Sequence, residues 1–154
     1  MLGHRRNQEG LTQHEIERSL QSWAKLQESL GFEPALVLDT QDAGKHGSRT
    51  RYNEERGVAY LGADVKPGPA SDARSRMSEL SCLAHELSHA ERHRRGYDRP
   101  SDQPDALVDE AEASLNASFY WLLGPVNRAD LIEDARDRLV DWLACSARSG
   151  QDGD

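Results

Sequence analysis

Four stretches with apolar residues at helical spacing, and a run of shorter apolar segments between the first two, constrain the fold of this chain most. Residues 12–30 carry the first helical pattern, which begins with a capping-box spacing at Thr12 and Glu15 and is followed by Gly31. Residues 35–64 alternate short apolar runs with polar and glycine-containing segments, as strands and turns do. We therefore expect a helix, then a small sheet, then further helices.

The middle segment predicts three short strands. Residues 35–38 read as a buried strand and residues 39–48 as a loop, and residues 49–53 and 57–64 then form a hairpin. We expect the sheet to be antiparallel. Because side chains alternate along 57–64, this strand is also a candidate to pair with an extended peptide.

Three helices are expected after the sheet. The first is predicted from a cap near Ser71 or Ser75 to about Arg95, the second from about 104 to 123, and the third over roughly 128–147. A helix, a small sheet and three helices give an α+β fold.

The length of the chain limits it to one domain. A chain of 154 residues is long enough to bury one core and short for two. We assign the domain to residues 12–148, with a flexible N-terminus over 1–11 and a flexible tail over 149–154.

Charge and composition narrow the choice of partners and compartment. The formal net charge of −8 argues against binding to nucleic acid or to anionic membranes, since both are held mainly through Lys and Arg. No apolar run is long enough for a secretory leader or a membrane span, and the two cysteines are too few for a disulfide framework. We expect a cytoplasmic protein, while export by a route without an apolar leader stays open.

The sequence His85-Glu86-Leu87-Ser88-His89 lies within the long central helix and carries the clearest chemistry. Residues four apart share a helix face, so both imidazoles can bind one metal ion. Neutral imidazoles suit Zn²⁺, and an adjacent carboxylate can take a proton from water. We predict one zinc ion per chain, with His85 and His89 as ligands and Glu86 as the general base.

The third ligand is expected from the next helix. Its predicted buried stripe consists of apolar residues at spacings of three and four: Val108, Ala111, Leu115, Phe119 and Leu122. Glu112 falls inside that stripe, where a carboxylate is costly to bury unless it is paired or bound to metal. We predict Glu112 as the third ligand. We expect Asp109 and Glu110 to be surface charges, with Glu110 as the substitute ligand.

Two further residues near the motif are candidates for accessory roles. His93 lies one turn beyond His89 and is expected to contact either a ligand or the substrate, with a role as a metal ligand as the alternative. Tyr97 follows the helix and could donate to the oxyanion that forms when water attacks a carbonyl, although packing is the simpler role.

At these residues the chain resembles zincins whose third ligand is a glutamate, and most closely the ImmA/IrrE-type metallopeptidases. Those proteins often carry HELGH with another histidine four residues on, matched here by residues 85–89 and His93. Their next helix commonly reads ExxAN, then Phe-Ala and Leu-Leu-Met-Pro, and residues 112–125 read E-A-S-L-N-A-S-F-Y-W-L-L-G-P in the same register. The resemblance covers about 57–125 and implies a zincin-like fold with Glu112 as a ligand.

The resemblance implies a zinc metalloendopeptidase that cleaves a particular protein, such as a DNA-binding repressor, without binding nucleic acid itself. A second similarity concerns residues 85–96, whose form HELxHAxRxxxG resembles secreted effector zincins that cut host proteins. The sequence is also compatible with a zinc-binding or sensing module without turnover, and with a helical interaction protein in which the motif arises by chance.

Overall fold

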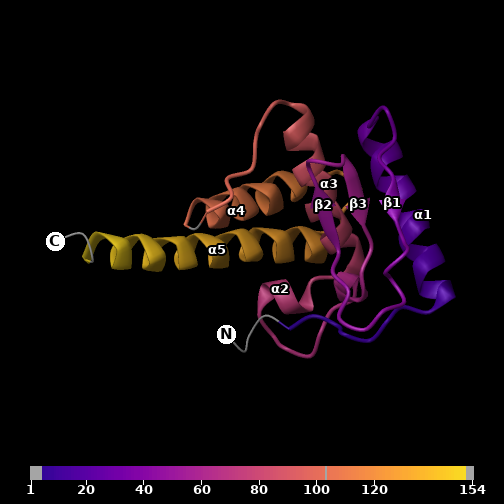
Figure 1. Cartoon of the computed structure of the whole chain (residues 1–154), viewed down its shortest axis with the longest axis horizontal. Coiled ribbons are helices and arrows are strands. Elements are labelled where there is room, and N and C mark those ends of the chain that lie inside the picture. Colours follow the sequence, from indigo (N-terminus) through magenta and orange to yellow (C-terminus); the bar gives the residue numbers. More distant parts are fainter. Residues whose placement is uncertain (1–4, 103, 152–154) are drawn as a thin grey trace.

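The computed structural model describes residues 5–102 and 104–151, with side chains to residue 148. The chain has an α+β fold, as predicted (Figure 1). Its elements in order are α1 Gln13–Leu30, β1 Leu38–Asp39, β2 Arg51–Asn53, β3 Val58–Tyr60, the 3₁₀ turn η1 Ala63–Val65, α2 Ala73–Arg76, α3 Glu79–Arg94, α4 Asp105–Ala117 and α5 Pro125–Gln151. Among these helices, none is long and apolar enough to span a bilayer.

Helix α1 begins and ends where the sequence predicts. Thr12 accepts a hydrogen bond from the backbone N–H of Glu15, whose carboxylate accepts one from the N–H of Thr12. Gly31 ends the helix in the left-handed region at φ 61°, which glycine adopts without strain. The buried indole of Trp23 then donates to the carbonyl of Leu36 at 2.9 Å and fixes the chain that leads into β1.

The sheet is mixed rather than antiparallel. Strands β2 and β3 form the predicted hairpin, but β1 lies parallel to β3, and the strand order is β1-β3-β2. The loop after β1 carries the chain across to the far side of the sheet, so the hairpin returns β3 into the middle. Strand β3 therefore has neighbours on both edges, and the prediction that residues 57–64 pair with a peptide is wrong. The outer edges of the sheet belong to β1 and β2.

The predicted helix from residue 71 or 75 to 95 is two helices. Asp72 caps the short α2 through the N–H of Ser75, the backbone of Met77 is extended with ψ 138°, and Ser78 caps α3 through the N–H of Ser81. A serine hydroxyl that accepts from a backbone N–H three residues on starts a new helix. The caps are therefore Asp72 and Ser78, not Ser71 or Ser75.

Helix α4 ends earlier in the chain than predicted, and helix α5 begins earlier. Helix α4 ends at Ala117 because residues 118–123 form turns, and α5 begins at Pro125, where the missing N–H of proline costs no hydrogen bond. Helix α5 extends to Gln151, into the segment expected as a flexible tail. Residues 152–154 of that segment lie outside the described residues.

The segment 5–11, expected as part of a flexible N-terminus, lies against the domain. The guanidinium of Arg6 donates to the carbonyls of Asp64 at 2.6 Å, Val65 at 2.8 Å and Met77 at 2.9 Å, and the side chain of Leu11 is buried. Residues 1–4 of the expected flexible segment lie outside the described residues.

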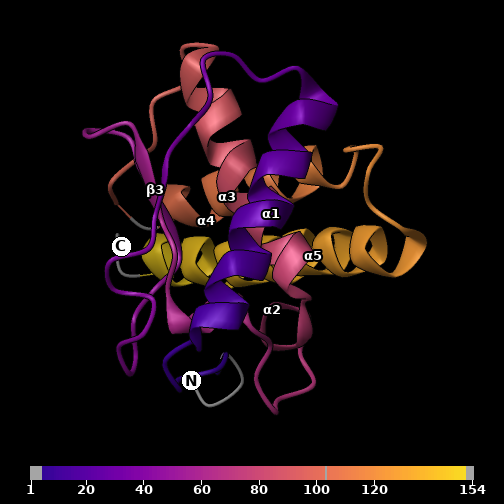
Figure 2. The same cartoon turned by 90° about the vertical axis from the view of Figure 1, so that its right-hand side faces the viewer.

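Helix α3 occupies the middle of the molecule. In Figure 1 it lies behind the sheet, with α1 on one side and the pair α4 and α5 on the other, and in Figure 2 it lies behind α1. Its buried side includes Leu83 and Leu87, which join Leu26 of α1, Leu61 and Leu131 of α5 in one core. Strand β2 and helices α4 and α5, which surround the candidate site, all pack on the helix that carries the motif.

Candidate metal centre

His85 and His89 project from the same face of α3 toward one point. Their Nε2 atoms lie 3.2 Å apart and their rings are nearly perpendicular, at 88°. Both side chains are buried, with 5% and 2% exposed. Two surface histidines on a polar face would be solvated instead.

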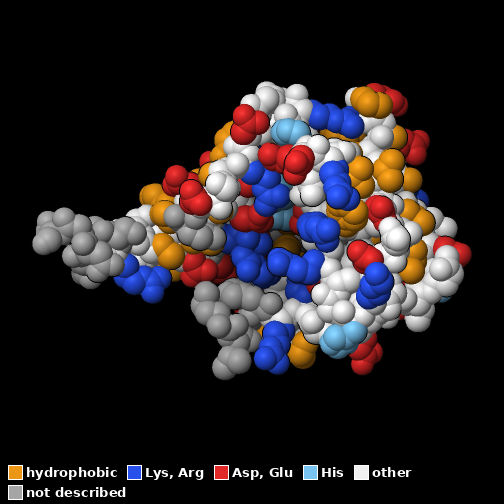
Figure 3. Space-filling model, viewed as in Figure 1, with side chains coloured by type: hydrophobic (Ala, Val, Ile, Leu, Met, Phe, Trp, Pro, Cys, Tyr) orange, Lys and Arg blue, Asp and Glu red, His pale blue; other side chains and the backbone are white. Residues whose placement is uncertain are grey.

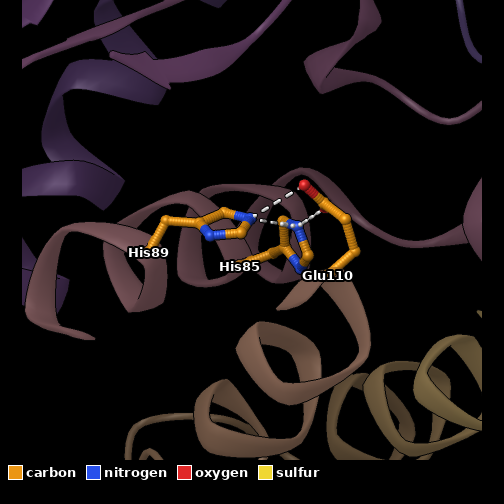
Figure 4. A group of neighbouring side chains, drawn as sticks. All are labelled: His85, His89 and Glu110. Atoms are coloured by element: carbon orange, nitrogen blue, oxygen red, sulfur yellow. Dashed lines mark hydrogen bonds and ion pairs between the residues drawn. The ribbon is translucent and has the colours of Figure 1, made fainter. Parts of the chain in front are cut away.

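Glu110 of α4 completes the group, so the expectation of a surface charge at this residue is wrong and Glu110 takes the place of the substitute ligand. Its Oε2 lies 2.9 Å from Nε2 of His85, and its Oε1 lies 3.3 Å from Nε2 of His89 (Figure 4). Ligand atoms that bind zinc tetrahedrally at about 2.0–2.1 Å lie about 3.3 Å from one another. The spacing, the burial and the chemistry of two imidazoles and one carboxylate therefore fit a zinc ion, and these three residues would hold it.

Glu112, the predicted third ligand, does not join this group. Its side chain is 51% exposed and pairs with Arg92 at 2.5 Å. The predicted buried stripe of α4 is wrong, since Leu115 is 45% and Phe119 75% exposed. These large apolar side chains point to solvent, and the face toward α3 and α5 is made of small residues.

The small residues explain why Glu110 reaches the histidines. Ala113, Ser114 and Ala117 are fully buried, so α4 packs closely against its neighbours. Glu110 lies one turn before Ser114, on the same face. Small residues at this spacing were the signal in the sequence that could have selected Glu110 over Glu112.

His85 is oriented from behind by a chain of buried polar groups that the sequence did not reveal. Its Nδ1 lies 2.7 Å from the Oγ of Ser114, and that hydroxyl donates to a carboxylate oxygen of Asp134 at 2.6 Å. Arg138 donates to the same carboxylate at 2.8 Å. With Nδ1 engaged, Nε2 is the nitrogen that faces Glu110, as in metal sites with an outer shell of carboxylates.

His89 also faces a carboxylate on its Nδ1 side. Oδ2 of Asp109 lies 3.7 Å from that nitrogen, and Asp109 is only 2% exposed, so the prediction of a surface charge is wrong. Arg99 donates to the same Asp109 oxygen at 3.1 Å. The positive charge of Arg99 thereby offsets the negative charge of this buried carboxylate.

Glu110 is held in its ionised form. Burial alone would raise its pKa, but hydrogen bonds from His85 and His89 and their charges hold the pKa far below the ordinary value. Arg99 and Arg138 also pair with this carboxylate. An ionised carboxylate between two imidazoles is the form that binds a metal ion.

Glu86 lies beside the group and faces strand β2. Its carboxylate accepts a hydrogen bond from the backbone N–H of Tyr52 at 2.9 Å. Burial raises the pKa of Glu86 to about 7, with the charge of His89 lowering the pKa and the charge of Glu110 raising it. A carboxyl group with such a pKa can both accept and release a proton near neutrality.

The two accessory candidates lie away from the three donor atoms. Nδ1 of His93 is 2.9 Å from the hydroxyl of Tyr52, and the imidazole groups instead with Glu54 and Asp98. Tyr97 is 38% exposed and stacks under the guanidinium of Arg92. Neither His93 nor Tyr97 lines the cleft over the candidate centre. This position does not support the contact expected of His93 or the donation to an oxyanion expected of Tyr97.

A cleft of about 210 Å³ opens over His85, Glu86 and Glu110. It gives these side chains access to a molecule from solvent. Cys82 also lines the cleft, and burial raises the pKa of its thiol to about 12, so the thiol stays protonated.

The assignment of a function rests on the chemistry of the site, because the comparisons with known proteins found no match. No protein-family model matches the chain, and neither a curated protein nor a solved structure matches it.

Proposed function

We propose that this protein is a zinc-dependent metallopeptidase that hydrolyses a peptide bond in a protein. The observation that carries the proposal is the convergence of three donor side chains, the buried His85 and His89 and the half-buried Glu110, next to a carboxyl group with a raised pKa. A histidine pair and a glutamate, with a neighbouring glutamate as base, form the donor set of hydrolytic zinc sites.

Zinc bound by these ligands supplies Lewis acidity, which lowers the pKa of water and polarises a carbonyl group. Glu86 then accepts a proton from water as it attacks the peptide carbonyl, and returns a proton to the leaving amine. The N–H of Tyr52 holds the Glu86 carboxylate in place by its hydrogen bond. Asp134, through Ser114, holds the imidazole of His85 in the orientation that ligation needs, and the carboxylate of Asp109 lies on the Nδ1 side of His89.

Catalysis by Glu86 is tested with protein loaded with one zinc ion per chain and a mixed peptide library, whose new termini are read by mass spectrometry. The wild type is expected to cleave a subset of peptides, and a chelator is expected to stop it. Glu86→Gln should keep its zinc and lose at least about a hundredfold in rate, the lower range for removing a general base. Glu112→Gln removes a charge on α4 outside the group and should cleave like the wild type.

Two results would overturn the proposal. One is a Glu86→Gln variant that cleaves as fast as the wild type. The other is a zinc-loaded wild type that cleaves neither the library nor any protein offered to it, such as the transcriptional repressors that the resemblance to ImmA/IrrE-type enzymes suggests.

A zinc-binding module without turnover is the second candidate. It keeps the same three ligands, and in it Glu86 serves only as the acceptor of the hydrogen bond from the N–H of Tyr52 and takes no proton from water. This candidate predicts zinc binding with full occupancy and a Glu86→Gln variant that behaves as the wild type in every assay.

A further inference from the structure

Arginines line the cleft over the candidate centre, in a chain whose net charge is −8. They are Arg6, Arg49, Arg51, Arg74, Arg99 and Arg138. The carboxylates that line the same cleft are fewer, from Asp64, Glu86 and Glu110. Figure 3 shows Lys and Arg side chains gathered around a hollow near the middle of this face, with histidine visible within it. The cleft is therefore locally positive on an acidic protein.

Three of the cleft arginines are committed to other parts of the protein. Arg6 donates to backbone carbonyls, among them those of Asp64 and Val65. Arg99 and Arg138 pair with Glu110. These guanidinium groups build the walls of the cleft and hold a candidate ligand, so they are already engaged within the protein.

The side chains of Arg49 and Arg51 are not engaged in this way by the described part of the chain. Both are exposed, and no carboxylate among the described side chains lies within ion-pair distance of either guanidinium. Residues two apart in an extended segment project to the same side. The guanidinium of Arg51 lies 4.4 Å from the ring centroid of Tyr60, which orients it without neutralising it.

Arg74, which lines the cleft, has a buried hydrogen-bond donor that is not satisfied within the described residues. Its Nε is buried without a hydrogen-bond partner among the described residues, and the nearest carboxylate oxygen, on Asp134, is 4.0 Å away. Burial lowers the pKa of Arg74, and so does the charge of neighbouring Arg138. Two adjacent guanidinium groups and a buried donor without an acceptor are stabilised when an oxyanion lies between them.

We propose that this cleft binds an anionic group of the substrate, a carboxylate or phosphoryl group on the peptide, close to the bond that is cleaved. Arg49, Arg51 and Arg74 are the residues assigned to it. Because the cleft lies next to His85 and Glu110, an anionic group bound there selects which peptides are cleaved. This role in substrate choice rests on the proposed function. A volume of about 210 Å³ holds roughly seven waters, which is room for one acidic side chain and its neighbouring backbone.

The surroundings favour a peptide over a nucleic acid as the carrier of the anion. The positive charge is local and recessed, while the net charge of −8 repels an extended polyanion. An acidic or phosphorylated residue places one oxyanion in the cleft and leaves the rest of its chain uncharged.

The test uses probes too small to be good peptidase substrates. Inorganic phosphate, N-acetylglutamate methylamide and the matched N-acetylglutamine methylamide are titrated into the zinc-loaded protein, and the Nε–Hε signals of the arginines are followed by NMR. Phosphate, the glutamate probe or both should shift the signals of Arg49, Arg51 and Arg74, and the glutamine probe should not. The glutamate arm identifies a carboxylate ligand and the phosphate arm a phosphoryl ligand.

Variants locate the binding. Arg49→Gln/Arg51→Gln and, separately, Arg74→Gln should raise the Kd of the active probe by about tenfold or more, the effect of losing a charge-assisted hydrogen bond. Arg74→Lys keeps the charge, so it controls for effects of Arg74→Gln on folding and should weaken binding less. Arg18→Gln/Arg136→Gln removes two exposed charges outside the cleft and should bind as the wild type does.

The outcomes for the cleft and for the centre are separable. Binding that persists in His89→Ala shows that the arginines hold the anion without an intact metal site. Binding that is lost equally in the Arg18/Arg136 control, or that no anionic probe shows at all, overturns the cleft proposal even if Glu86-dependent cleavage is found. Absence of zinc with anion binding intact overturns the proposed peptidase and leaves the cleft as an anion site.

Discussion

The hydroxyl of Ser114 lies 2.7 Å from Nδ1 of His85, on the opposite side of the ring from the nitrogen that faces Glu110. We predict that Ser114→Ala weakens zinc binding by about ten- to a hundredfold, the usual effect of losing an outer partner of a ligating histidine. The measurement is competition against a chromophoric zinc chelator.

Ser118→Ala is the matched control, because Ser118 is a buried serine just past the end of α4 whose hydroxyl donates to the carbonyl of Leu115. It should bind zinc like the wild type. Equal affinities for Ser114→Ala and Ser118→Ala would show that the hydroxyl between His85 and Asp134 does not support ligation.

Arg6 joins the N-terminal segment to the turn η1 and to the end of α2. We predict that Arg6→Ala lowers the free energy of unfolding by about 2 kcal/mol, since several carbonyls lose a charged donor. Urea denaturation followed by circular dichroism measures this. The exposed Arg5 provides the control, and a loss in Arg5→Ala as large as that in Arg6→Ala would contradict the assignment.

The capping box of α1 gives a dependence on pH. Hydrogen bonds from Lys66 and from the N–H of Thr12 lower the pKa of Glu15 from 4.5 to about 2. The folded state therefore binds the proton less readily than the unfolded state. The resulting stability is fully present above pH 4.5 and is lost as the pH falls toward 2.

We predict that Glu15→Gln is less stable than the wild type by at most about 1 kcal/mol at pH 7, because the pair with Lys66 is partly exposed. The difference should shrink between pH 4.5 and 2, as measured by urea denaturation across that range. Glu17→Gln, at an exposed position of the same helix, should show little difference at any pH. A difference for Glu15→Gln that grows on acidification would contradict the assigned role of this carboxylate.

Local signals in the sequence predicted helix α1 well. The spacing of Thr12 and Glu15 and the glycine at residue 31 placed both ends of α1, because capping depends on residues within one turn. The strand pairing was not local. The parallel contact of β1 with β3 depends on the path of the loop between β1 and β2, which no short pattern encodes.

In the candidate site, too, local spacing was predictive and the packing between elements was not. Four-residue spacing predicted that His85 and His89 share a face, and the structure brings them together. The choice between Glu110 and Glu112 depended on how α4 is rotated against its neighbours. Apolar periodicity predicted the wrong face, since Phe119 is exposed and Ser114 is buried.

Elemental analysis of purified protein, loaded with zinc and then desalted, decides whether His85, His89 and Glu110 form a zinc site. We predict about one zinc ion per chain in the wild type and in Glu112→Ala, and little or none in Glu110→Ala and His89→Ala. Circular dichroism of the same samples confirms that each variant is folded. Zinc retained in Glu110→Ala and lost in Glu112→Ala, or a wild type that binds no zinc, would contradict this ligand set.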